Sequence, residues 1–144
     1  MNRTLLAAAL AATAASTTFA AGDTRQLVTM PPPMVQHMLG NMRDHLVALT
    51  EIQQSLGKGD FQRAAEIAEG RIGMSSLESH GASHMAPFMP KPMQDIGTQM
   101  HRAASRFALA AQDASADGNA LRAIGALSEV TRQCVACHSA YRAH

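Results

Sequence analysis

The stretch ALRAIGALSEVTRQCVACHSAYR, residues 120–142, carries the clearest folding pattern of this chain. Core-forming side chains recur in it at intervals of three and four residues, the period of an α-helix with one buried face. They are Leu121, Ile124, Leu127, Thr131, Cys134, His138 and Tyr141. The turn residues 117–119 precede it. We therefore expect a C-terminal helix that places Cys134 and His138 on its core-facing side.

Residues 134–138 of this helix, CVACH, have the Cys-x-x-Cys-His spacing that attaches c-type haem. Two thiols one turn apart can each add to one haem vinyl group, and the adjacent histidine can ligate the iron. Other uses of Cys-x-x-Cys fit less well. A thioredoxin-like site lies in a βαβ unit, a zinc site needs further soft ligands, and a disulfide across two residues would be strained. We expect one covalent haem c, held by Cys134 and Cys137, with His138 as the proximal iron ligand.

The N-terminal residues 1–20 have the pattern of a cleaved secretory signal peptide. Arg3 supplies the positive start, an apolar run follows from Leu5 to Ala15, and Thr18 and Ala20 supply small residues for cleavage after Ala20. The apolar run is too short to span a bilayer. We therefore expect a mature domain of residues 21–144 in the periplasm, without a membrane span after cleavage. Export agrees with the haem motif, because c-type haem is attached outside the cytoplasm.

Composition favours a single all-α domain. Removing residues 1–20 from 144 leaves 144 − 20 = 124 residues, enough for one ordinary domain. Loss of Arg3 leaves 11 basic residues against 11 acidic ones, so the mature chain is formally neutral and suits neither nucleic acid nor an anionic membrane as its main partner. The chain has no Trp and one Tyr, whereas the helix formers alanine, leucine and methionine are abundant.

Start and stop signals divide the mature chain into four helices. The first begins at the prolines 31–33 and ends at residues 57–59. Its apolar stripe is Val35, Met38, Met42, Leu46, Leu49, Ile52 and Leu56. Asp60 caps the second helix, residues 73–92 form a long connection, and Pro92 opens the third helix. We expect an antiparallel up-down-up-down four-helix bundle with covalent haem.

An exported four-helix chain with its single Cys-x-x-Cys-His in the last helix resembles the class II cytochromes c, the family that includes cytochrome c prime. The closing CVACHSAYR (134–142) and the turn GKGDF (57–61) are similar to the corresponding segments of that family. The resemblance implies a four-helix bundle with one haem c and His138 as the proximal ligand. It also implies Arg142 beside the proximal face, periplasmic electron transfer or gas binding, and a homodimer through the first two helices.

The other face of the iron is where that family divides, because some members leave it open and others fill it with a methionine. Counting from the turn after the first helix by the family's spacing reaches Met42. Counting back from Gly57 by the number of residues that separate His138 from the start of the last helix reaches Met38. We expect Met42 as the distal ligand, before Met38 and then Met34, and an open position remains the alternative. Methionine at helical spacing is also ordinary core filling. The family's propionate-facing Arg, one turn before the distal position, is replaced here by Met38.

Three functions suit these features. The first is a periplasmic electron carrier that meets redox partner proteins, and the second is a five-coordinate haem protein that binds NO or CO. The third is a metal-handling protein that uses the long connection, where His80, His84, Met85 and Met89 could bind Cu(I). We assign no role to His37, His45 and His101, which we expect on helix surfaces or flanks. No acid–base pair or nucleophile constellation indicates an enzyme.

Overall fold

A computed structural model describes residues 22–144 of the chain. The expected signal peptide, residues 1–20, lies outside the described residues. The described part is mostly α-helical, which confirms the expected all-α class. Within residues 22–144, no helix is both long and apolar enough to cross a membrane.

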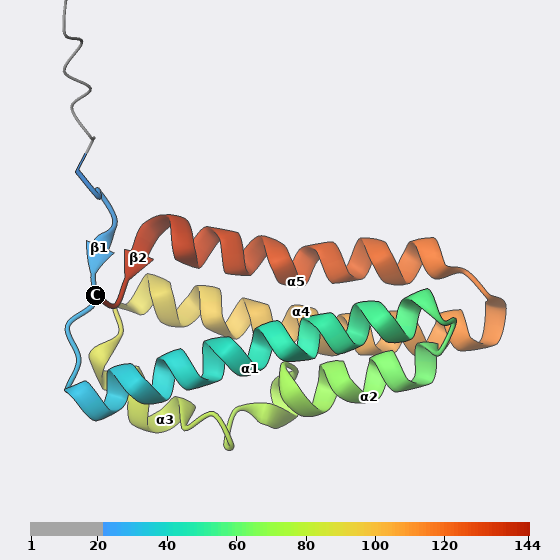
Figure 1. Cartoon of the computed structure of the whole chain (residues 1–144), viewed down its shortest axis with the longest axis horizontal. Helices are drawn as coiled ribbons and strands as arrows, with labels where there is room; N and C mark the ends of the chain where they lie inside the picture. The colour runs from blue at the N-terminus through green and yellow to red at the C-terminus, as the bar shows by residue number, and fades with distance from the viewer. Residues whose placement is uncertain (1–21) are drawn as a thin grey trace, which may run out of the picture.

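Four main helices account for most of the structure and lie along its long axis (Figure 1). They are α1 (Pro32–Gly57), α2 (Phe61–Arg71), α4 (Lys91–Asp117) and α5 (Ala120–Ala140). The long connection between α2 and α4 contains short helical segments. These are η1 (Met74–Ser76), α3 (Ala82–Met85) and η2 (Ala86–Phe88).

The helix boundaries agree closely with the signals in the sequence. Prolines lie in the first turns of α1 and α4, where a missing backbone N–H costs nothing. The Asp60 carboxylate accepts a hydrogen bond of 3.1 Å from the Arg63 backbone N–H and so caps α2. Gly118 ends α4 with a φ of 73°, a left-handed conformation that glycine adopts without strain. Asn119 then caps α5 through the backbone N–H of Arg122.

The core is built mainly from small side chains. α2 packs against α1 and α4, and α4 packs against α5, whereas α1 and α5 make little direct contact. Alanines of all four main helices are buried at these contacts, around the fully buried Phe107 and Ile52. Small residues let helix backbones approach closely, so the three packed pairs are tight. The separation between α1 and α5 leaves room that the core does not fill.

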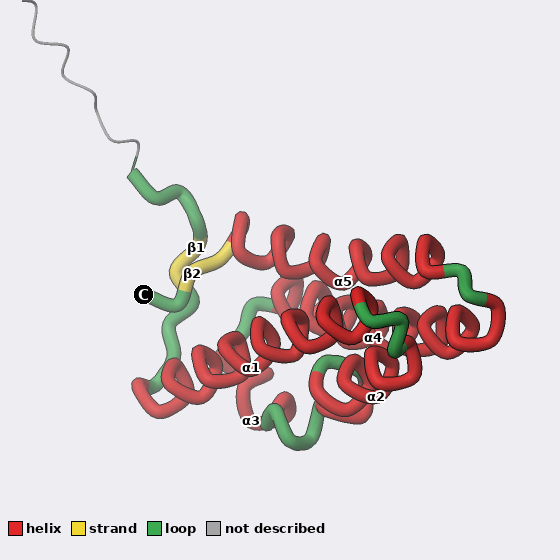
Figure 2. The backbone as a smooth tube through the Cα atoms, turned by 45° about the vertical axis from the view of Figure 1, so that its right-hand side comes forward, coloured by secondary structure: helices red, strands yellow, loops and turns green. Residues whose placement is uncertain are grey.

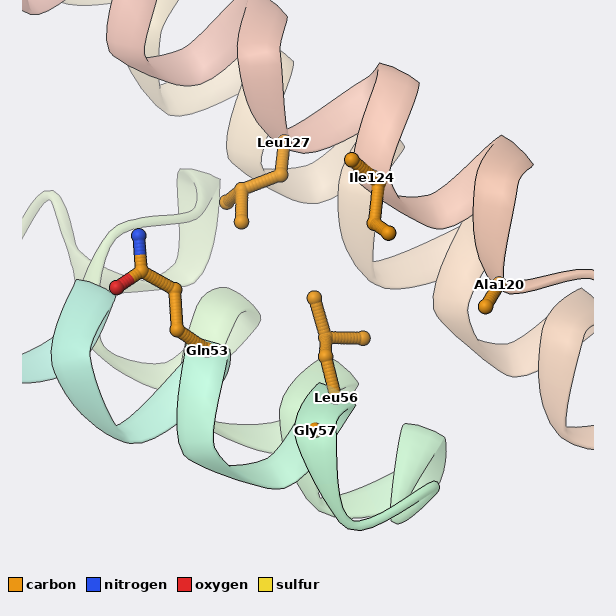
Figure 3. A pocket seen from close by; sticks show the side chains of 6 residues that line it. All are labelled: Gln53, Leu56, Gly57, Ala120, Ile124 and Leu127. Carbon is orange, nitrogen blue, oxygen red and sulfur yellow. The ribbon is translucent and has the colours of Figure 1, made fainter.

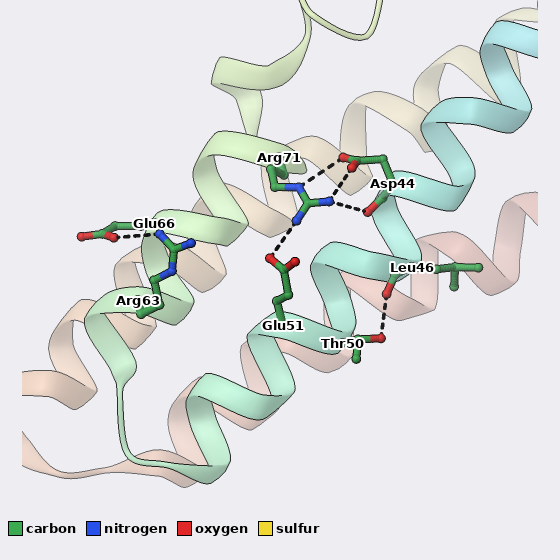
Figure 4. A network of polar contacts seen from close by, with 7 residues as sticks. All are labelled: Asp44, Leu46, Thr50, Glu51, Arg63, Glu66 and Arg71. Atoms are coloured by element: carbon green, nitrogen blue, oxygen red, sulfur yellow. Dashed lines mark hydrogen bonds and ion pairs between the residues drawn. The ribbon is translucent and has the colours of Figure 1, made fainter.

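A charged network ties α1 to α2 (Figure 4). The Arg71 guanidinium donates to the carboxylate of Asp44 through two nitrogens and to Glu51 Oε2 at 2.8 Å. Its hydrogen bond holds the pKa of Asp44 below the usual range. Because these side chains are only partly buried, the network contributes orientation more than stability. It also directs the Asp44 carboxylate toward Arg71.

Two short strands join the beginning and the end of the described chain (Figure 2). β1 (Gln26–Leu27) pairs in parallel with β2 (Tyr141–Arg142), and the Val28 N–H donates to the Arg142 carbonyl at 2.8 Å. The sequence analysis gave no indication of this pair. It places Tyr141 beyond the end of α5, whereas we expected it on the helical stripe.

The exposed face of α5 differs from the expected one. Leu121 is 80% exposed and Ile124 is 52% exposed, and the buried positions of α5 are Ala123, Leu127 and Val130. In α1, Leu46 of the expected stripe is likewise exposed. The reason is that α5 packs on α4 while α1 stands apart from it, so the sides of α1 and α5 that face each other are not closed.

Candidate functional site

A cavity of about 550 Å³ opens between α1, the long connection, α4 and the C-terminal end of α5. Its wall is largely apolar and rich in thioethers. The methionines that line it are Met38, Met42, Met85, Met89, Met93 and Met100. A volume of this size is typical of pockets for small organic ligands, which occupy roughly 300–1,000 Å³. The cavity exists because α1 and α5 diverge, so it follows from the same packing that exposes one side of each helix.

Cys134, Cys137 and His138 all line this cavity from α5, as the spacing of the motif predicts. Both cysteines are free and half-buried, and Cys134 Sγ lies 3.6 Å from the carbonyl of Val130. Burial raises the pKa of both thiols. The cysteines are therefore protonated thiols at neutral pH, and they show no sign of the lowered pKa typical of a thioredoxin-like nucleophile.

His138 and Arg142 lie at the open end of the cavity. His138 is exposed and contributes to the cavity wall, and its carbonyl accepts a weak hydrogen bond of 3.4 Å from Arg25. Arg142 lines the same cavity, and its Nε is buried without a hydrogen-bond partner. The nearest charge is Asp23 Oδ2, at 3.6 Å from that nitrogen. The structure thus brings Arg142 to the end of the cavity where the motif lies.

The three methionines that we considered as distal ligands lie in different surroundings. Met42 is half-buried and Met38 is buried, and both line the cavity from α1. Met34 packs against the same methionine cluster without contributing to the cavity wall. Met42 and Met38 are thus placed to face a ligand in the cavity, and Met34 is the weakest of the three.

The histidine predictions need a correction. We expected His45 and His101 on surfaces or flanks, but they are only 6% and 8% exposed, and His80 of the long connection is equally buried. The three rings form a cluster, with centroids 4.8 Å apart for His45 and His80, 5.6 Å for His80 and His101, and 6.1 Å for His45 and His101. The expectation was wrong because His45 belongs to the buried stripe of α1 that faces α2 and α4.

Burial keeps these rings neutral. Desolvation, reinforced by His80 and His101, lowers the pKa of His45 to about 4. Desolvation also lowers the pKa of His80, with His101 as the second cause. The position of His45 among Ala48, Ile52 and Ser55 at intervals of three and four was the signal in the sequence that could have revealed its burial.

The other residues of the connection that we considered for Cu(I) are not gathered with the histidine cluster in one way. His84 is exposed, whereas Met85 is buried and lines the cavity with Met89. As the side chains stand, no three histidine, cysteine or carboxylate groups among the described residues are placed to hold one metal ion. A Cu(I) site made by the connection alone is therefore not assembled.

The residues of the cavity fit haem c. They supply two free thiols and an imidazole in the attachment spacing, beside an apolar volume that suits a flat macrocycle. Two buried polar atoms of the wall residues, Arg142 Nε and His45 Nε2, have no hydrogen-bond partner in the protein. Buried polar groups without a partner are costly, and they often indicate an unmodelled group nearby.

A second, smaller opening lies further along the same separation of α1 and α5 (Figure 3). Leu56 and Gln53 of α1 face Ile124 and Leu127 of α5 across it. It carries no titratable or thiol group, and it shows which turns of the two helices lie opposite each other.

Comparisons of this chain with family models, with curated proteins and with solved structures find no match. The function must therefore be inferred from the residues of the chain and from their geometry.

Proposed function

We propose that this chain is an exported monohaem c-type cytochrome that carries electrons between periplasmic proteins. The observation that carries the proposal is that Cys134, Cys137 and His138 all line one large, thioether-rich cavity. The proposal includes cleavage after Ala20, a four-helix bundle in the up-down-up-down order, and a role without enzymatic turnover. It is supported by the helix order, by the signal pattern and by the haem motif.

Cys134 and Cys137 would hold the haem through thioether bonds, in which each thiol S–H adds across one vinyl double bond. His138 would ligate the iron from the same helix. Arg142, with its buried and unpartnered Nε, would face the haem edge with a positive charge. The bound haem supplies one-electron chemistry, and the protein sets its potential and its access to solvent. The apolar methionine wall excludes water from it, and this wall is the main contribution of α1 and the long connection.

Met42 is the distal ligand that we propose, and the second opening supports this position. Leu56 of α1 and Ile124 of α5 lie on opposite walls of that opening. His138 lies 14 residues after Ile124, and Met42 lies 14 residues before Leu56. Because α1 and α5 run in opposite directions in Figure 1, equal steps from this reference lead to the same level.

The side of α1 that each residue occupies also favours Met42 over its neighbours. Met42, Leu49 and Leu56 are spaced by seven residues and share the side that faces the openings toward α5. His45 instead lies on the side of α1 that packs toward α4 and the connection. A thioether ligand stabilises ferrous iron and raises the reduction potential, which suits an electron carrier.

The absorption spectrum of the reduced protein, with and without carbon monoxide, tests this function. Ligation by His138 and Met42 predicts sharp low-spin bands that carbon monoxide does not change. Broad high-spin bands that shift on addition of carbon monoxide would show an open iron. That result would replace electron transfer by the binding of small gases such as NO and CO.

A further inference from the structure

The buried histidine cluster has no role in the proposed cytochrome function. Its members come from three separate parts of the chain, which are α1 for His45, the long connection for His80 and α4 for His101. All three rings line the same cavity. Burying three imidazoles together is costly unless their polar atoms are satisfied, so the cluster requires an explanation.

Neighbouring groups fix which ring nitrogen carries the proton. His101 Nδ1 lies 2.6 Å from the carbonyl oxygen of Ile72, which can only accept a hydrogen bond. Nδ1 therefore carries the proton, and Nε2 of the neutral ring carries a free lone pair. A histidine that ligates a metal commonly has this kind of support from a backbone carbonyl.

His80 has a similar arrangement. Ser76 Oγ donates to the Gly73 carbonyl at 2.8 Å, which leaves Oγ as an acceptor for His80 Nδ1 at 3.4 Å. The backbone of His80 is also held from α1, because His37 Nε2 and Asn41 Nδ2 both donate to its carbonyl, at 2.8 and 2.9 Å. The connection is thus attached to α1 at the residue whose ring enters the cluster.

His45 provides the observation that points to a ligand. Its Nε2 is buried and has no hydrogen-bond partner in the protein. The adjacent carboxylate, Asp44, is engaged by Arg71 and so leaves the cluster without a paired anion. The remaining polar atom of His45 needs a partner from outside the chain.

We propose that His45, His80 and His101 bind one borderline or soft transition-metal ion of the Zn²⁺ or Cu⁺ class. Imidazole nitrogen suits these ions, and the thioethers of the same cavity wall favour Cu⁺ further. The site is distinct from the haem-attachment residues and does not depend on the haem proposal. It also differs from a Cu(I) site made by the connection alone, because two of its ligands come from α1 and α4.

The spacing of the rings suits one ion, whereas their orientation must change. Metal–nitrogen bonds of roughly 2.0–2.1 Å at tetrahedral angles place imidazole centroids about 5 Å apart. The observed separations of 4.8, 5.6 and 6.1 Å are close to this value. The side chains as they stand do not close on one ion. Closing requires rotation of the rings about χ2, a torsion with a broad energy minimum.

Metal content per chain tests the site in the mature haem protein. The protein is dialysed against buffered Zn²⁺ or, anaerobically, Cu⁺, and the bound metal and the iron are each measured against chain concentration by amino-acid analysis. We expect one added metal ion per chain. Absence of both ions from the wild type would overturn the site. Iron is measured separately, so a failure of the haem proposal appears as missing iron whatever the other metal shows.

Variants identify the ligands. His45→Gln and His101→Gln should weaken binding at least about tenfold. The matched control is His84→Gln, which removes an exposed histidine of the connection and should leave binding unchanged. Loss of binding in His84→Gln alone would assign the metal to the connection and overturn the site. If the two cluster variants fail to fold, X-ray absorption of the zinc-loaded wild type decides, because three imidazole ligands support the site and fewer contradict it.

Discussion

Acid should destabilise this protein through His45 more than through its exposed histidines. The folded chain holds the pKa of His45 at about 4, against an ordinary value of 6.5, mainly because the ring is buried and secondly because His80 and His101 lie beside it. The unfolded chain therefore binds this proton at a higher pH than the folded chain does. Stability from the neutral ring is complete above pH 6.5 and is lost as the pH falls from about 6.5 toward about 4.

The magnitude follows from these two pKa values. At pH 5 the unfolded imidazole is almost fully protonated and the folded one is almost fully neutral, which corresponds to about 2 kcal/mol lost relative to pH 8. The lowered pKa of His80 adds a loss in the same direction. A loss of this size is a large fraction of the stability of an ordinary domain.

Urea unfolding of the metal-free protein at pH 8 and pH 5, in the presence of a chelator, measures the effect. The loss between the two pH values should be about 2 kcal/mol smaller in His45→Gln than in the wild type. The exposed His84 supplies the control, since His84→Gln should show the wild-type loss. Equal losses in the wild type and in His45→Gln would refute the assignment of a buried, neutral His45.

Two further predictions concern the haem cavity. Cys134→Ala/Cys137→Ala should give a protease-sensitive chain with a broad thermal transition, because the cavity of about 550 Å³ loses its occupant and unfilled core volume is costly; a double variant that melts as sharply and as high as the wild type would contradict this. Met42→Ala should convert a low-spin ferrous spectrum to a high-spin one that responds to carbon monoxide and should lower the reduction potential, whereas Met38→Ala should only weaken packing. The opposite pattern would move the ligand by one helical turn.

Local signals predicted the helices well, because each helix end depends on residues close in sequence. The Asp60 cap, the left-handed Gly118 and the opening prolines act through their own backbone geometry. The haem motif was predictable for the same reason, since its spacing within one helix places both thiols and His138 on one cavity wall.

Features that depend on how separate helices pack could not be predicted in this way. The exposure of Leu121 and Ile124 follows from the distance between α1 and α5, which no local pattern encodes. The cluster of His45, His80 and His101 needs the long connection to be placed between α1 and α4. Periodicity could indicate that His45 is buried, but it could not identify its neighbours.

The mass of the exported protein, together with acid–acetone extraction, tests the central claim most directly. The claim predicts a chain of residues 21–144 that carries the mass of one haem and keeps its colour in the precipitate, because thioether bonds to Cys134 and Cys137 are covalent. A chain with the mass of the polypeptide alone, exported from cells with a working haem-attachment system, would contradict it.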